Sequence, residues 1–251
     1  MKKWIQRIVK LVIAAIVAYV ILCTTLYFDQ RNLLYHPSTV DYSSCANFKP
    51  EEHVTFGDVR LYTNTFVANN TRQILVYFYG NGESGCESPM WRDIANSDNM
   101  DYLIYEYPSY DNGTRETTRE NVLSDIDTLA QHLANRSVII IGRSLGNGPA
   151  TYLAAKMNPQ KIILISPYDR LSSVVDALYI PGFLLKDNFE PIEYLKSYNG
   201  TVIVFAGEND AQINYHISQR LNATKFILVT NAGHNDIVDK AYGQILSEIR
   251  N

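Results

Sequence analysis

The amino-acid sequence predicts an α/β protein with a mostly parallel sheet, helices on both faces of that sheet and an N-terminal transmembrane helix. Three observations predict this. Short apolar runs recur without alternating polar residues, as in strands that are buried on both faces. Segments with apolar residues at helical spacing separate several of these runs. At the N-terminus, a basic flank precedes an uncharged apolar stretch that is long enough to cross a bilayer.

The first 30 residues indicate a membrane anchor. Four basic residues precede residues 11–28, which carry no charge. With Ile8 and Val9 included, this stretch can cross the roughly 30 Å of bilayer hydrocarbon. A cleaved signal peptide is the alternative, but no Ala-x-Ala site stands at the end of the run. We therefore expect residues 1–30 to form a cytoplasmic basic flank and transmembrane anchor, and residues 31–251 to form one globular domain.

The basic flank also predicts the orientation in the membrane. By the positive-inside rule the N-terminus lies in the cytoplasm, and residues 31–251 lie in the periplasm, in a secretory lumen or outside the cell. Five Asn-x-Ser/Thr sequons begin at Asn69, Asn112, Asn135, Asn199 and Asn222. Their number is little above chance, so glycosylation and the choice of compartment stay open. Cys45 and Cys86 could pair in an oxidising compartment, and unpaired thiols fit the sequence equally well.

Charge and composition argue against several classes of function. The net charge is −4 and no basic stripe follows the N-terminus, so nothing favours nucleic-acid binding. The sparse histidines and cysteines offer no ligand set at metal-binding spacing, and neither a metal nor an organic cofactor is expected. Nothing in the sequence indicates an oligomeric state.

The elements of the globular domain are predicted in chain order. An extended segment at 32–39 leaves the anchor, and two strands, 53–56 and 59–67, flank a Gly57-Asp58 turn signal. The remaining strands are expected in 73–82, 101–110, 137–142, 161–166, 201–207 and 225–230. Helices are expected in 117–133, after Gly146 through Ala154, and in 235–250. Sites in parallel sheets form at the carboxyl ends of strands, so the residues just after each strand are the candidates.

The stretch Gly142-Arg143-Ser144-Leu145-Gly146 lies between a predicted strand and a predicted helix. This Gly-x-Ser-x-Gly pattern is typical of a sharp turn that exposes a nucleophilic serine. Small residues are needed on both sides because the strained turn leaves no room for side chains. A tight turn with no chemical role is the alternative, and the five-residue pattern alone does not exclude it.

A serine hydroxyl is a weak nucleophile, so it needs a base and an acid that orients the base. His234 follows a predicted strand, whereas His216, the other histidine beyond Ser144, lies in a predicted helix. Asp210 also follows a strand and is the preferred acid. Weaker candidates for the acid are Glu208, Asp169 and Asp187. The chain order Ser144, Asp210, His234 predicts a catalytic triad.

Acyl transfer also needs backbone N–H donors for an oxyanion, each commonly worth about 3–4 kcal/mol. Leu145, at the start of the helix after Ser144, is expected to supply one. The glycine-rich loop at 80–85 is expected to supply the second, with Asn81 the first choice and Gly82 the next. A phosphate-binding loop is disfavoured there because no Gly-Lys-Ser/Thr follows.

Six motifs spread over nearly the whole chain belong to one pattern. They are YHPS (35–38), YFYGNGES (77–84), YEYPSYDNGT (105–114), GRSLGNGPA (142–150), SPY (166–168) and AGHND (232–236). Together they resemble the α/β-hydrolase superfamily, and within it the membrane-anchored serine hydrolases similar to the alpha/beta-hydrolase-domain depalmitoylases and lysophospholipid hydrolases. The resemblance implies an α/β-hydrolase fold for residues 31–251 and a catalytic role for that domain.

The chain departs from the family pattern at three positions. Tyr79 stands where the family has a histidine, which affects how the loop with the second oxyanion donor is supported. Glu106 and Ser109 replace the usual aspartate and glycine. None of these changes removes a catalytic group.

The sequence therefore predicts a serine hydrolase that cleaves an ester, a thioester or an amide through an acyl-Ser144 intermediate. The segment between strands 161–166 and 201–207 is too short for a large lid domain, so we expect a lightly covered site near the membrane surface. Such a site, together with the anchor, favours lipid or acylated substrates. Two alternatives remain: a membrane-tethered binding protein without turnover, and an acyltransferase with the same triad.

Overall fold

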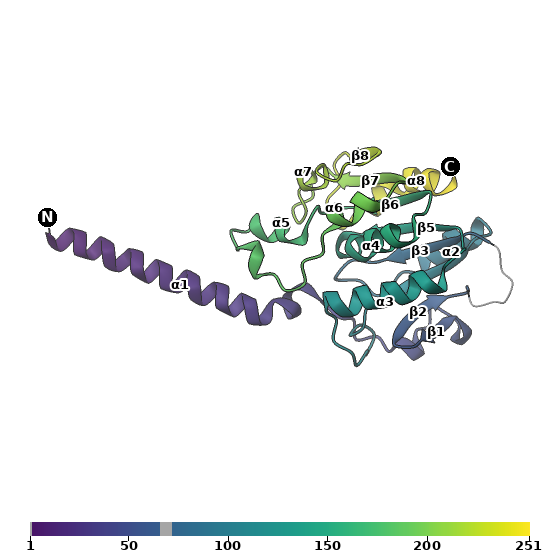
Figure 1. Cartoon of the computed structure of the whole chain (residues 1–251), viewed down its shortest axis with the longest axis horizontal. Coiled ribbons are helices and arrows are strands. Elements are labelled where there is room, and N and C mark those ends of the chain that lie inside the picture. The colour runs from purple at the N-terminus through teal and green to yellow at the C-terminus, as the bar shows by residue number, and fades with distance from the viewer. Residues whose placement is uncertain (1, 66–71) are drawn as a thin grey trace.

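One twisted sheet organises the body of the protein (Figure 1). The computed structural model describes residues 2–65 and 72–251, and within them the sheet has eight strands in the order β1-β2-β4-β3-β5-β6-β7-β8. The strands are β1 (His53–Phe56), β2 (Val59–Thr63), β3 (Ile74–Phe78), β4 (Asp101–Glu106), β5 (Val138–Arg143), β6 (Lys161–Ile165), β7 (Thr201–Gly207) and β8 (Lys225–Val229). Strands β3 to β8 pair in parallel. Strand β1 pairs antiparallel with β2, and β2 pairs antiparallel with β4. The predicted fold class is confirmed.

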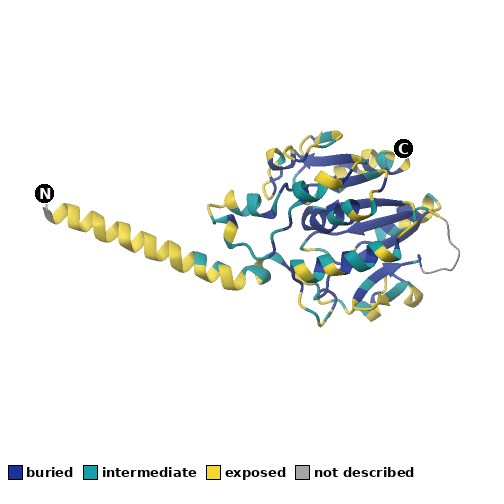
Figure 2. Ribbon diagram, in the orientation of Figure 1, coloured by how far each residue is buried: buried dark blue, intermediate teal, exposed yellow. Residues whose placement is uncertain are grey.

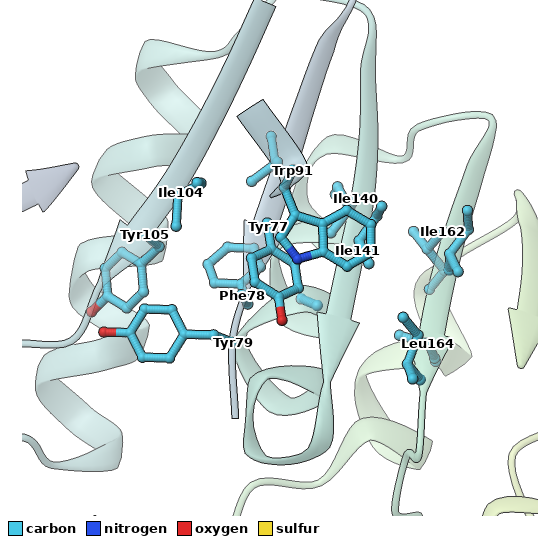
Figure 3. Packing of buried hydrophobic residues seen from close by; sticks show 14 of the residues in the cluster. Tyr77, Phe78, Tyr79, Trp91, Ile104, Tyr105, Ile140, Ile141, Ile162 and Leu164 are labelled. Carbon is cyan, nitrogen blue, oxygen red and sulfur yellow. The ribbon is translucent and has the colours of Figure 1, made fainter. Parts of the chain in front are cut away.

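Helices cover both faces of the sheet. They are α2 (Pro89–Ser97), α3 (Arg119–His132), α4 (Asn147–Met157), α5 (Leu171–Asp176), α6 (Pro191–Tyr194), α7 (Tyr215–Ser218) and α8 (Ile237–Arg250). Side chains on β3 alternate between the faces: Tyr77 packs on Trp91 of α2 with ring centroids 4.6 Å apart, whereas Phe78 packs on Tyr105 (Figure 3). The Tyr105 hydroxyl donates to Asp125 of α3, so Phe78 and Tyr105 lie on the α3 side.

The central strands are buried because both of their faces are apolar. All five residues of β3 are buried, and the four β-branched residues of β5 that precede Gly142 are buried as well. Such runs suit parallel strands that are covered on both sides. In the β3–β5 pairing Phe78 lies opposite Gly142, which brings the loop after β3 next to the loop that carries Ser144.

A long N-terminal helix projects away from the sheet (Figures 1 and 2). Helix α1 (Lys2–Leu34) is about 50 Å long at 1.5 Å per residue, and most of its side chains are exposed. By length and composition it can span a membrane. The prediction of an extended segment from residue 32 was wrong for residues 32–34, because no helix breaker precedes Pro37.

Four further features differ from the prediction or complete it. The short helices α2, α5 and α6 were not predicted; α2 begins at Pro89, and only its buried Trp91, Ile94 and Ala95 reveal an apolar face. Strand β2 ends at Thr63, and the rest of the predicted strand lies partly outside the described residues. Cys45 and Cys86 form a disulfide with Cα atoms 5.8 Å apart. Four sequon asparagines are exposed, while Asn69 lies outside the described residues.

Candidate active site

Ser144 stands in a sharp turn between β5 and α4. Its φ is +50°, the left-handed region that an L residue seldom adopts, and the 3-10 turn Ser144–Gly146 follows directly. A Cβ atom on Gly146 would lie 2.2 Å from the carbonyl oxygen of Phe78, and one on Gly142 would lie 2.7 Å from Cβ of Ala150. Both glycines are therefore required by close packing against β3 and α4, as the Gly-x-Ser-x-Gly pattern indicated.

His234 and Asp210 meet Ser144 from two other strand ends. His234 lies in the loop between β8 and α8, and its Nε2 is 2.8 Å from Oγ of Ser144. Its Nδ1 is 2.8 Å from Oδ2 of Asp210, which follows β7. The three side chains form one chain of hydrogen bonds, since parallel strands bring their carboxyl ends to the same edge.

The Asp210 carboxylate is held in place by its own loop. Oδ1 accepts the backbone N–H groups of Gln212 at 2.9 Å and Ile213 at 2.8 Å, which leaves Oδ2 for His234. Burial raises the pKa of Asp210, but the hydrogen bonds from His234 and Ile213 outweigh it and hold the pKa below its usual value. An ionised carboxylate is therefore present beside the imidazole.

The weaker candidates from the sequence have other partners. Glu208 is exposed, and its carboxylate accepts the N–H of Asn231 at 2.9 Å. His216 is exposed on α7 and bonds Gln219 at 2.9 Å. Asp169 accepts the N–H of Arg170 and contacts Arg220, while Asp187 accepts from Arg31 and from the N–H of Arg119. None of these side chains contacts Ser144 or His234 in the hydrogen bonds of the described residues.

The predicted oxyanion loop lies beside Ser144. Gly80, Asn81 and Gly82 line a cavity of about 230 Å³ together with Ser144 and His234. The Asn81 carbonyl accepts from the Tyr110 hydroxyl at 2.7 Å and from the His36 N–H at 3.3 Å. These bonds fix the peptide orientation around Asn81.

Gly82 and Leu145, the other two predicted oxyanion donors, lie at different places around Ser144. Gly82 lines the same cavity one residue further along the loop. Leu145 is buried next to Ser144, and its carbonyl accepts from the Tyr168 hydroxyl at 3.1 Å. Gly80 cannot serve as a donor in this geometry, because its N–H is given to a Glu83 carboxylate oxygen at 3.0 Å.

Sequence reasoning missed a pair of charged residues that joins the loops of the site. The Glu83 carboxylate accepts from Gly80 and from the Tyr77 hydroxyl at 3.1 Å, and it pairs with Arg143. Arg143 also donates to the carbonyl oxygen of His234 at 3.3 Å. This ion pair connects the oxyanion loop to the histidine loop. A charged residue inside the Gly-x-Ser-x-Gly motif was the one signal that could have revealed it.

Two of the departures from the family pattern are partners of each other. The Tyr79 hydroxyl donates to Oε1 of Glu106 at 2.7 Å and accepts the N–H of Tyr107 at 3.1 Å. Oε2 of Glu106 accepts the N–H of Gly85 at 3.0 Å. The Tyr79–Glu106 pair therefore contacts the backbone of the glycine-rich loop. Burial, with a smaller contribution from the charge of Asp111, raises the pKa of Glu106 well above its usual value.

This arrangement has the groups that nucleophilic catalysis needs. The imidazole can take the Ser144 proton at Nε2 while Nδ1–H donates to the Asp210 carboxylate. Ser144 is nine-tenths buried, and a cavity opens beside its hydroxyl. Among the described residues no group of three His, Cys, Asp or Glu side chains could hold a metal ion.

Comparisons with known proteins agree with the fold. No protein-family model matches the chain. The protein MT2364 of Mycobacterium tuberculosis, itself uncharacterised, is 26% identical over 256 residues, which covers 92% of this chain and 90% of that protein. Alpha/beta hydrolase domain-containing protein 17B of Homo sapiens is 25% identical over 193 residues, which covers 72% of this chain and 66% of that protein.

A solved structure extends the likeness to the architecture. The esterase PF2001 of Pyrococcus furiosus superposes with a TM-score of 0.64 at 14% identity, covering 86% of this chain and 96% of the esterase. The likeness to this esterase concerns the fold, and the likeness to protein 17B concerns the sequence. Both likenesses agree with the mostly parallel sheet and the helices on both of its faces. The chain has the α/β-hydrolase fold, and its sequence is similar to that of an alpha/beta hydrolase domain-containing protein.

Proposed function

We propose that the protein is a serine hydrolase that cleaves carboxylic esters or thioesters. The observation that carries the proposal is the hydrogen-bonded series Ser144–His234–Asp210, with both contacts at 2.8 Å, beside a cavity of about 230 Å³. The names of the similar proteins, an esterase and an alpha/beta hydrolase domain-containing protein, support hydrolytic chemistry. The anchor helix favours a lipid or acylated substrate.

The reaction proceeds through an acyl-enzyme. His234 Nε2 accepts the Ser144 proton as Oγ attacks the substrate carbonyl carbon, and the carbonyl oxygen becomes an oxyanion. The N–H groups of Leu145 and Asn81, or of Gly82, bind that oxyanion. His234 then gives the proton to the leaving alcohol or thiol, and water repeats the sequence on acyl-Ser144. Asp210 orients the imidazole and stabilises its protonated form.

The location follows from the anchor. Residues 1–30 act as a basic flank and membrane anchor with the N-terminus in the cytoplasm. Residues 31–251 act as the catalytic domain on the other side of the membrane. The Cys45–Cys86 disulfide supports an oxidising compartment, which a periplasm, a secretory lumen or the cell exterior provides.

A fluorophosphonate probe tests the nucleophile. We expect the full-length protein in detergent micelles to be labelled at Ser144, with the labelled peptide located by mass spectrometry. Ser144→Ala should abolish labelling and lower ester turnover by about 10⁶-fold, whereas the matched change Ser173→Ala should alter neither.

The same experiment separates the alternatives. A folded wild-type protein that stays unlabelled would contradict the proposal and favour a binding protein. Labelling at Ser144 with transfer of the acyl group to an added alcohol, and little release of free acid, would indicate an acyltransferase instead.

A further inference from the structure

An apolar groove lies between the anchor helix α1 and residues 171–185, which contain α5 and the 3-10 turn Gly182–Leu184. Its volume is about 320 Å³ and its lining is almost wholly apolar. Leu26 and Leu34 contribute from α1, and Leu171, Val174 and Leu184 from the other side. A groove of this size and character lies within the range of sites that hold small apolar ligands.

Residues 171–185 are hydrogen-bonded to the C-terminal half of α1. The Tyr19 hydroxyl donates to the Tyr179 carbonyl at 2.9 Å, and the Gln30 side chain donates to the Leu184 carbonyl at 3.1 Å. Tyr19 is nine residues before Phe28, the last residue of the uncharged stretch. At 1.5 Å per residue, Tyr179 therefore lies about 14 Å along the helix from the end of that stretch. If α1 spans a bilayer, the tip of residues 171–185 reaches into the same leaflet.

The side chains at this tip suit lipid. Leu178 is 66% exposed, and Tyr179 and Phe183 are each 87% exposed. Asp176 is the one charged residue of 171–185, and its carboxylate accepts the N–H of Gly182 at 2.7 Å. Large apolar side chains grouped on a surface mark a contact with a membrane or a partner, and here the membrane helix runs alongside.

Residues at the inner end of the groove are linked to residues beside the candidate active site. The Leu34 carbonyl, at the end of α1, accepts from the Asn81 side chain at 3.1 Å. On the opposite wall, Leu171 is three residues after Tyr168, whose hydroxyl donates to the Leu145 carbonyl. Both walls of the groove are thus connected to the residues that flank Ser144.

We propose that this groove binds the acyl chain of a membrane-resident ester or thioester, with the anchor helix as one wall. The proposal rests on the hydrolase function proposed above and deepens it. The carbonyl of the substrate lies at Ser144, and the chain lies between α1 and residues 171–185, open to the bilayer. The anchor then forms part of the substrate site as well as a tether. An acyl chain fits because it has no polar group that the apolar lining would leave unpaired.

Chain-length selectivity tests the groove. We compare full-length protein in lipid nanodiscs on butyryl and palmitoyl p-nitrophenyl esters, together with two variants of α1. Leu26→Trp fills the groove, and we expect the ratio of palmitoyl to butyryl turnover to fall about tenfold, equivalent to about 1.4 kcal/mol. Ile21→Trp, on the far side of the helix and 60% exposed, should leave the ratio unchanged. Equal ratios in wild type and Leu26→Trp would overturn the proposal.

Photochemical cross-linking tests the same proposal on the unmodified protein. A hexadecyl fluorophosphonate with a diazirine at its chain end should bind Ser144 and, on irradiation, cross-link to peptides from 23–34 or 171–185. Ser144 labelled with cross-links confined to other segments would overturn the groove alone. Ser144 left unlabelled by both this probe and a short fluorophosphonate would overturn the hydrolase function, and the role of the groove with it.

Discussion

Strands β5, β7 and β8 are followed by the three side chains of the proposed triad, whereas β3 and β4 lead into loops held by buried polar side chains. On the first side, Ser144, Asp210 and His234 contact one another directly, with both hydrogen bonds at 2.8 Å. On the second side, Tyr79 and Glu106 lie beneath the glycine-rich loop and contact its backbone. Under the proposed function, one half of the sheet carries the triad, and the other half supports the loop that carries the second oxyanion donor.

This comparison predicts that substitutions in the two halves have different signatures. A change on the β5–β8 side should lower activity and leave the fold intact, because the reactive groups lie at the edge of the sheet. A change on the β3–β4 side should lower stability, because its groups are buried and lose hydrogen bonds that water cannot replace.

Of the changes that distinguish the two halves of the sheet, Asp210→Asn is expected to have the largest effect. The variant keeps an oxygen for the Gln212 and Ile213 N–H groups but cannot hold His234 in the required tautomer. We expect kcat for an ester to fall about 10⁴-fold with little change in melting temperature. The control Glu208→Gln, at an exposed carboxylate that bonds Asn231, should keep full activity. If Glu208→Gln lost activity and Asp210→Asn did not, the assignment of the acid would be wrong.

An intermediate effect is expected for Tyr79→Phe. Removing the hydroxyl takes away the hydrogen bonds that it makes to Oε1 of Glu106 and to the Tyr107 N–H in a fully buried site. The free energy of unfolding in urea should fall by about 1–3 kcal/mol, while Ser144 still reacts with a fluorophosphonate.

The matched control for Tyr79→Phe is Tyr152→Phe. The Tyr152 hydroxyl lies 3.3 Å from both Asp127 oxygens and is only partly buried. Its loss should cost less than about 0.5 kcal/mol. If Tyr79→Phe were as stable as Tyr152→Phe, the supporting role of the β3–β4 side would be contradicted.

The smallest effect concerns the pH dependence of stability. The pKa of Glu106 is raised well above 4.5 by burial, so the folded chain keeps this proton to a higher pH than the unfolded chain. The stability from this group is present below the pKa of the unfolded chain and is lost as the pH rises towards the raised pKa. Urea unfolding measured from pH 4 upward should therefore show a smaller alkaline decline in Glu106→Gln than in wild type. Parallel pH curves for the two proteins would contradict this.

Much of the fold followed from local patterns. Buried apolar runs predicted the parallel strands, since a strand covered on both faces has no polar face to display. The short helix α2 was missed because its apolar face has only three buried residues. The end of α1 was placed too early, because nothing at Asn32 or Leu33 signals whether a helix continues.

The candidate site likewise has residues that the sequence predicted and contacts that it did not. Strand order and strand ends were enough to nominate Ser144, Asp210 and His234, because a parallel sheet brings the residues after its strands to one edge. The Glu83–Arg143 ion pair was not predicted, because no spacing rule relates a residue after β3 to one at the end of β5. The Tyr79–Glu106 contact was not predicted either, because the two residues lie far apart in the chain and no sequence pattern links them.

By itself, the sequence determined the strands and the longer helices, which helix is long and apolar enough to span a membrane, and which serine follows a strand in a tight turn. These properties depend on neighbouring residues in the chain. Only the tertiary structure decided that Cys45 pairs with Cys86, that Glu106 supports Tyr79, and that residues 171–185 form a groove with α1. Those contacts join segments far apart in the chain, and their distances are set by packing of the whole fold.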